Sequence, residues 1–196
     1  TPEAALHAIA RAVTTEDRKL FDEYVDEDAV LAAMHEEATA LLADNIAALR
    51  ERHPADWFFR HDTAFMYGYM EERRAADIAF VRAALDYYFD SLRVPISRTD
   101  GAARWASDEM RALAAAYTVT VGAVRTDGDR AEADAVLRGN DSTYGRLLPS
   151  AAVTFELVRA EDRRWKLVRV RTAADEHGFF AFVDAAERYW ALQGWD

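Results

Sequence analysis

Cysteine is absent from this 196-residue sequence. Disulfide bridges, thiolate nucleophiles and metal sites ligated by cysteine are therefore excluded. No apolar run approaches the roughly 20 residues that a membrane-spanning helix needs, so we expect no direct membrane insertion of this chain. Internal repeats and low-complexity linkers are also missing, which favours a single domain over residues 1–196.

Basic residues are scarce relative to acidic ones. The chain has 24 lysine and arginine residues against 35 aspartate and glutamate residues, a formal net charge of −11. This charge repels phosphate groups and anionic lipid, so we expect neither nucleic acid nor a membrane surface as a partner. Hydrophobic residues make up 51% of the chain and aromatic residues 12%. Such side chains offset the entropy of the ordered chain only when they are packed, so a globular domain with a sizeable core is expected.

Three helix starts are expected near the N-terminus. Thr1, followed by proline, has the sequence of a helix cap. Thr14 or Thr15 is expected to cap a second helix. Asp26 is expected to cap a third, whose apolar residues keep a period of 3.6 to about Arg52.

Aromatic residues are concentrated after Pro54. The segment "HPADWFFRHDTAFMYGYM" predicts a helix broken near Gly68. A longer helix is expected from about Glu71 to Pro95, with two apolar stripes that indicate burial from two sides. The last helix of this half is expected over residues 100–116. Its inward side chains should be Trp105, Met110 and Leu113.

From Tyr117 the apolar period changes to 2, which is typical of strands. Asp127-Gly128 predicts one hairpin, and Glu161-Asp162 is expected to form the two-residue turn of a second. The loop between them contains "NDSTYG", whose turn residues suit an adaptable lid as well as a plain connection. In the second hairpin one face should carry Val153, Phe155, Leu157, Val168 and Val170, and the other Thr154, Glu156, Leu167, Arg169 and Arg171.

These elements together predict an α+β fold. A helical N-terminal half, residues 1–116, should pack on one face of a curved four-stranded antiparallel meander, residues 117–172. A C-terminal helix, residues 176–193, should complete the domain. The prediction follows because a sheet that is apolar on one face must bury that face against another layer.

The order of elements resembles the cystatin-like, or nuclear transport factor 2-like, α+β superfamily. The resemblance lies in residues 117–172 as the meander and in "AIARAVTTEDRKLFDEYVDEDAV" as the helical entry. This entry is similar to that of bacterial exported families of unknown function, in which a "yVD" turn, here Tyr24-Val25-Asp26, precedes a long helix. The superfamily contains isomerases, dehydratases and non-catalytic binding or oligomerising modules, so the resemblance implies a fold without selecting a function. No catalytic set of these enzymes matches residues of this chain.

The acidic segment "DEYVDEDAVLAAMHEEA" raises the question of a metal site around His35. A zincin motif needs a second histidine four positions later, where this chain has Thr39. A di-iron motif needs a glutamate three positions earlier, where it has Ala32. Acids at the start of a helix interact favourably with the helix dipole, so we expect a solvated helix face and no metal.

The aromatic segment contains the residues of a candidate acid–base site. His61 or Asp62 could act as a base and Tyr67 or Tyr88 as a hydrogen-bond donor, because burial shifts such pKa values toward neutrality. The alternative interpretation is a histidine at the edge of the core, since neighbouring residues such as His61 and Asp62 point apart on a helix. The aromatic rings themselves are expected to form core, or to line a cavity for a small apolar ligand.

Polar residues also alternate on the predicted sheet, and they are candidates for ligand binding. Glu132 and Asp134 lie on the second strand and Arg169 and Arg171 on the fourth. On the inner face they would form a ligand site, in which two arginines hold a carboxylate. On the outer face they would form cross-strand ion pairs, each worth under about 1 kcal/mol, or a homodimer surface. We favour the outer face, because the valine, leucine and phenylalanine residues already supply an inner one.

The absence of a catalytic motif favours a non-enzymatic bacterial domain that binds a small molecule or a protein partner, without cofactor or metal. We expect it to be extracytoplasmic, either secreted or tethered to the membrane upstream of Thr1, since the sequence does not begin with methionine. The alternative is a small-molecule lyase or isomerase with a site in the cavity between helices and sheet. A roomy cavity would favour ligand binding or catalysis, and an exposed apolar sheet face would favour protein interaction.

Overall fold

The computed structural model describes residues 1–90 and 101–195 and confirms the α+β fold. The predicted helix end at Pro95 lies outside these residues. The sheet is an antiparallel meander with the strand order β1-β2-β3-β4, and a C-terminal helix follows it. The strands are β1 (Tyr117–Asp127), β2 (Arg130–Gly139), β3 (Ser150–Arg159) and β4 (Trp165–Arg171), and the C-terminal helix is α7 (Phe179–Gln193).

The first three helices begin at side-chain caps, two of which were predicted. The Thr1 hydroxyl accepts a hydrogen bond from the Ala4 amide, and the Asp26 carboxylate accepts one from the Ala29 amide. The prediction for the second helix was wrong, because Asp17 caps it while the Thr14 and Thr15 hydroxyls donate to carbonyl groups of the preceding helix. The helices are α1 (Pro2–Thr15), α2 (Arg18–Tyr24), α3 (Glu27–Asp44), α4 (Ile46–Arg52), α5 (Thr63–Asp90) and α6 (Gly101–Ala116).

Two predicted helix boundaries differ from the observed ones. The third helix was expected to continue to Arg52, but it ends at Asn45, whose side-chain amide donates to the Leu41 carbonyl and competes with the helical backbone. A break was expected at Gly68, but α5 runs through it without interruption. Asp62 starts this helix by accepting from the Phe65 amide, and Pro54 begins only a turn that leads to the short 3-10 helix η1 (Phe58–Arg60).

The inward face of α6 consists of small side chains. Ala103, Ala106 and Ser107 are buried there, and α6 packs closely along α5. Trp105, Met110 and Leu113, which were predicted to point inward, line a hollow between α6 and α7 instead of the contact with α5. Because this hollow is open, Trp105 is 39% exposed.

The second hairpin differs from its predicted register. The expected turn at Glu161-Asp162 is a longer loop, and the β3–β4 register shifts between Glu156 and Leu157. This bulge brings Leu167 opposite Leu157, on the buried face rather than the polar face predicted for it. The first hairpin turns as expected, with Gly128 in the left-handed conformation that the tight turn requires.

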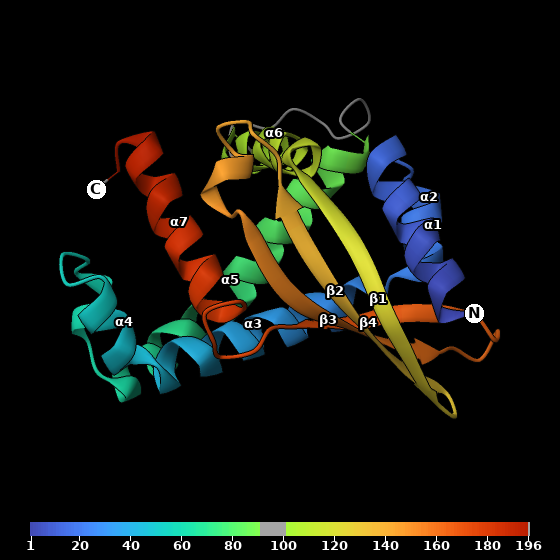
Figure 1. The fold of residues 1–196 in the computed structure, drawn as a ribbon, viewed down its shortest axis with the longest axis horizontal. Helices are drawn as coiled ribbons and strands as arrows, with labels where there is room; N and C mark the ends of the chain where they lie inside the picture. The colour runs from blue at the N-terminus through green and yellow to red at the C-terminus, as the bar shows by residue number, and fades with distance from the viewer. Residues whose placement is uncertain (91–100, 196) are drawn as a thin grey trace.

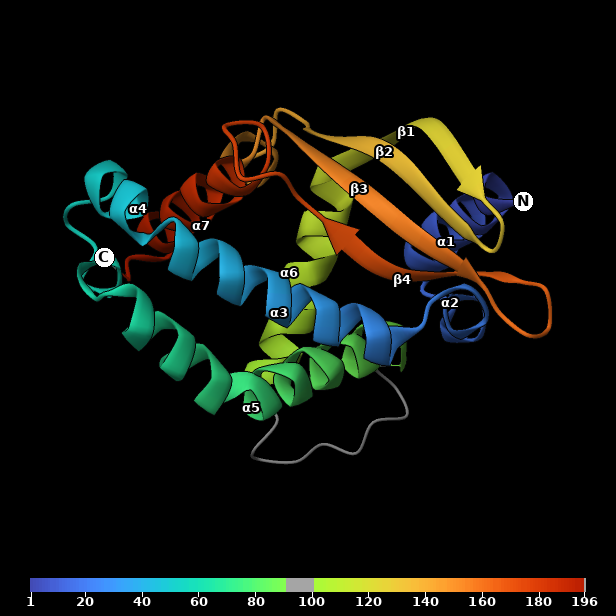
Figure 2. The same ribbon diagram turned by 90° about the horizontal axis from the view of Figure 1, so that it is seen from below.

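The helices enclose the inner face of the sheet (Figure 1). Helix α3 lies along the edge strand β4, α5 packs on α3, and α6 runs directly into β1 (Figure 2). Helix α1 covers one end of the inner face and α7 the other, so the two termini lie at opposite ends of the molecule.

Two packed clusters form the core, one at each end. The first joins α1 to the sheet through residues including Leu6, Leu157 and Trp165. The second joins α3, α4 and α5 to α7 through residues including Leu49, Met66 and Phe179. Two hollows lie along the middle of the inner face, between these clusters.

Candidate functional site

Two adjoining hollows occupy the space beneath the inner face of the sheet. The sheet hollow, of about 560 Å³, lies between α3 and the four strands. The helix hollow, of about 450 Å³, lies between α6, α7 and the end of the sheet. Both are lined by Leu137 of β2 and Phe182 of α7, so they meet at these side chains. We call the two hollows together the inner groove.

The walls of the inner groove are apolar and partly uncovered. Val119 on β1 is 50% exposed and Met34 on α3 is 48% exposed, and both line the sheet hollow. Trp190 on α7, which lines the helix hollow, is 40% exposed. Recessed apolar surface of this kind is typical of ligand-binding grooves, because covering it releases free energy of about 25 cal/mol for each Å².

Glu109 is the acidic group in the wall of the helix hollow. Its Oε2 accepts hydrogen bonds from the Tyr144 and Tyr189 hydroxyls, each at 2.7 Å. The hydrogen bond to Glu109 raises the pKa of Tyr144, and burial, reinforced by Glu109, raises the pKa of Tyr189. Both phenols therefore stay protonated at neutral pH and act as hydrogen-bond donors.

Glu37 is the corresponding acid in the sheet hollow, on α3. One carboxylate oxygen accepts a 2.7 Å hydrogen bond from the Thr172 amide, and the other lies 3.4 Å from the Arg169 guanidinium. The charge of Glu37 is therefore balanced by groups of the protein itself. This pair joins α3 to β4 and to the residue that follows it.

The segment around His35 is less solvated than predicted. The His35 side chain is only 9% exposed and packs toward α5, with Nε2 3.6 Å from the Asp77 carboxylate. Glu37 is also largely buried, whereas Glu36 and, in the first turn of α3, Asp28 have the expected exposed positions. The prediction of a solvated face failed because α3 is enclosed by both β4 and α5. Within residues 1–90 and 101–195, no three histidine or acidic residues are grouped as metal ligands would be.

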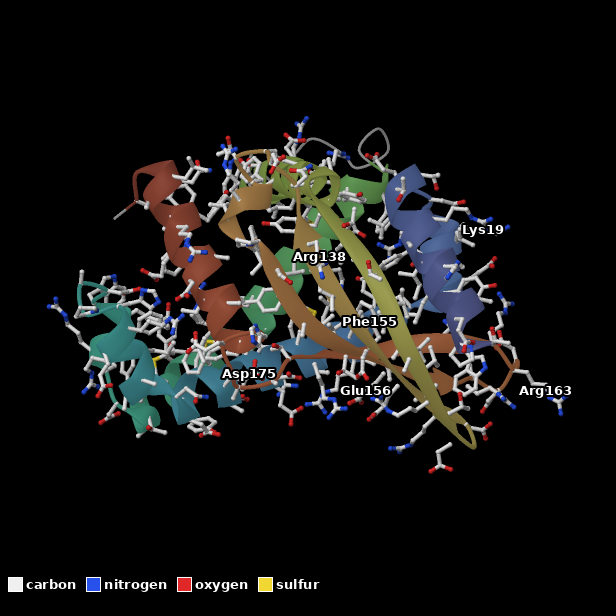
Figure 3. All side chains as sticks on the ribbon, viewed as in Figure 1. Lys19, Arg138, Phe155, Glu156, Arg163 and Asp175 are labelled. Atoms are coloured by element: carbon white, nitrogen blue, oxygen red, sulfur yellow. The ribbon has the colours of Figure 1, made fainter. Side chains whose placement is uncertain are left out.

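The polar sheet residues lie mainly on the outer face, where their charges are paired. Arg171 forms ion pairs with Glu132, at 2.9 Å, and with Glu156. Arg125 bonds the Asp134 carboxylate at 3.0 Å, and this contact lowers the Asp134 pKa. Figure 3 labels Phe155 and Glu156, successive residues of β3 that belong to the inner and outer faces. Because Arg169 and Arg171 hold different carboxylates, they do not form the predicted grip on a ligand carboxylate.

The residues of the candidate acid–base site are not brought together. The His61 ring stacks on Phe65, with centroids 3.8 Å apart, and Asp62 caps α5. The Tyr67 hydroxyl donates to Asp44, while the Tyr88 hydroxyl donates to the Val13 carbonyl. The two tyrosines are separated by about 30 Å along α5, at a rise of about 1.5 Å per residue. None of the four predicted residues lines the inner groove.

His53, the other histidine of this segment, joins α4 to α7. Its Nε2 lies 2.9 Å from the Asp184 carboxylate, which also receives two 2.6 Å hydrogen bonds from Arg52. These contacts, chiefly those from Arg52, lower the Asp184 pKa. The cluster fixes α7 at one wall of the inner groove and has a structural explanation.

Comparison with known proteins adds no relative. No protein-family model, curated protein or solved structure matches this chain significantly. In the described part of the chain, no helix is both long enough and apolar enough to cross a bilayer.

The site residues that sequence reasoning missed are Glu109, Leu137, Tyr144, Phe182 and Tyr189. Tyr144 belongs to the "NDSTYG" segment that was singled out as an adaptable loop. The others carry no local signal, because they come from different elements and meet only in the folded chain.

Proposed function

We propose that this protein binds a small hydrophobic molecule in the inner groove. The observation that supports the proposal is the pair of apolar hollows that meet at Leu137 and Phe182. Their volumes, about 450 and 560 Å³, lie within the range of roughly 300–1,000 Å³ that small-molecule sites occupy. The packed clusters at both ends hold the walls in place, so little ordering is needed when a ligand enters.

The polar groups around the groove suit binding. Glu37 is engaged by Arg169 and the Thr172 amide, and the phenols of Tyr144 and Tyr189 stay protonated. The oxygen atoms of these groups can orient a ligand by accepting hydrogen bonds from it. The outer face of the sheet carries paired charges instead of a continuous apolar surface. These charges give no support to the homodimer expected through this face, which stays a prediction.

A neutral fluorescent probe tests the proposal. N-phenyl-1-naphthylamine should bind the wild-type protein with one-site behaviour and a large gain in fluorescence, and 1-octanol should displace it. The substitution Val119→Trp should weaken this binding about tenfold or more, since the indole would fill the sheet hollow from a residue that is already half exposed.

The matched control is Val158→Trp. Val158 is also a partly exposed strand valine, but it lies outside the linings of both hollows. Tryptophan and valine both suit strands, so neither variant should disturb the sheet. The proposal fails if the wild-type protein does not bind the probe, or if both substitutions change its affinity equally.

A further inference from the structure

Glu109 is set among aromatic rings in the helix hollow. Five rings, those of Trp105, Tyr117, Phe182, Tyr189 and Trp190, line the same hollow, and the rest of its wall is apolar. Trp195, which follows α7, adds another ring, 5.6 Å from Trp105 between centroids. A carboxylate in such surroundings loses part of its hydration, so its charge needs a partner.

The protein supplies Glu109 with hydrogen bonds but with no opposite charge. Both tyrosine hydroxyls donate to Oε2, and among the described residues no side chain or amide donates to Oε1. Within residues 1–90 and 101–195, no arginine, lysine or histidine lies within ion-pair distance of this carboxylate. Glu37, in the adjoining hollow, shows the contrast, because Arg169 balances it.

We propose that the groove takes an amphiphilic organic amine, whose ammonium group binds at Glu109 and whose hydrocarbon chain extends past Leu137 and Phe182. This inference rests on the proposed function and names the class of ligand. The ammonium group would donate to the free oxygen of Glu109, and the surrounding ring faces attract cations. The net charge of −11 also favours the approach of a cation.

An anionic amphiphile fits the groove less well. Its head group would be repelled by Glu109 in the helix hollow, and in the sheet hollow Glu37 already engages the charge of Arg169. Arg171, which lines the sheet hollow, is already paired with Glu132 and Glu156, and the neighbouring Arg169 is paired with Glu37. A bound anion would have to displace one of these carboxylates.

Three ligands with the same eight-carbon chain separate the contribution of the head group. We would titrate the protein by calorimetry at pH 7 with n-octylamine, 1-octanol and sodium octanoate, all below their aggregation concentrations. n-Octylamine, which is protonated at this pH, should bind about tenfold or more tightly than 1-octanol, and octanoate most weakly. Equal affinity for the amine and the alcohol would overturn the inference.

Two glutamate variants separate a local effect from the overall charge. Glu109→Gln keeps an oxygen that accepts from both tyrosines, while Glu36→Gln removes the same charge at an exposed site on α3. Glu109→Gln should abolish the preference for the amine and leave the affinity for 1-octanol unchanged, which also shows that the variant is folded. Glu36→Gln should keep the preference. If both variants lose it equally, the effect is general charge attraction and the inference is wrong.

The same titrations distinguish the two proposals. Binding of 1-octanol without preference for n-octylamine would leave the hydrophobic groove standing and refute only the ammonium site. Binding of none of the three ligands would refute both.

Discussion

The inner and outer faces of the sheet differ in how their polar groups are used. The outer face is rich in charges, but Arg125, Arg171 and their carboxylates satisfy one another. The inner face has few polar groups, and one of the acids beneath it, Glu109, has no opposite charge beside it in the described part of the chain. The proposed ammonium site therefore rests on a single unbalanced charge in apolar surroundings and not on the dense set of paired charges.

A second contrast lies within the inner face, between its packed end and its hollow middle. Leu157 is 1% exposed in the cluster beneath α1, whereas Leu137 borders both hollows. Leu157→Ala should lower the free energy of unfolding by about 2–5 kcal/mol, because it leaves a cavity in a packed region. Leu137→Ala should cost less than about 2 kcal/mol, since it enlarges an existing hollow. Urea unfolding measures both, and equal costs would show that the groove is packed like the core.

Loss of the Asp184 contacts with Arg52 and His53, beside the groove, should have the next largest effect on the free energy of unfolding. Asp184→Asn leaves Arg52 and His53 without their shared carboxylate and should cost about 1–3 kcal/mol at pH 7, measured by urea unfolding. Because the folded protein lowers the Asp184 pKa, this stabilisation is complete above the unfolded value of about 3.9 and is lost as the pH falls through the lower folded value. A difference between wild type and variant that persists to the lowest pH would contradict this.

A substitution on the outer face should have the smallest effect on the free energy of unfolding. Asp134→Asn removes a carboxylate that is about half exposed, so it should lower the free energy of unfolding only slightly in low salt and still less in high salt. Its folded pKa is also lowered, so the small effect should likewise disappear in acid. Thermal unfolding at two salt concentrations measures it. A cost as large as that of Asp184→Asn would mean that the outer charges contribute more than their exposure predicts.

Much of the fold could be predicted because its signals are local. Thr1 and Asp26 cap helices within three residues, and Gly128 marks a turn by its own conformational freedom. One error is a local competition, because the Asn45 side chain ends a helix by donating to the Leu41 carbonyl. Other errors arise where tertiary packing decides, as at the bulge beside Leu157 that moves Leu167 to the other face.

The candidate site could not be predicted for the same reason. Glu109 meets Tyr144 across 35 residues and Tyr189 across 80. No periodicity or motif connects positions so far apart in different elements. His61 and Asp62 showed a local pattern that suggested chemistry, but stacking on Phe65 and capping of α5 explain it.

The central claim, that the inner groove holds a small hydrophobic molecule, is tested most directly by methyl NMR spectra during a titration with 1-octanol. The methyl signals of Val119 and Leu137, which line the groove, should shift in proportion to the bound fraction. Those of Val136 and Val158, which lie outside both hollows, should not. Shifts confined to the latter pair, or spread evenly over all four residues, would contradict the claim.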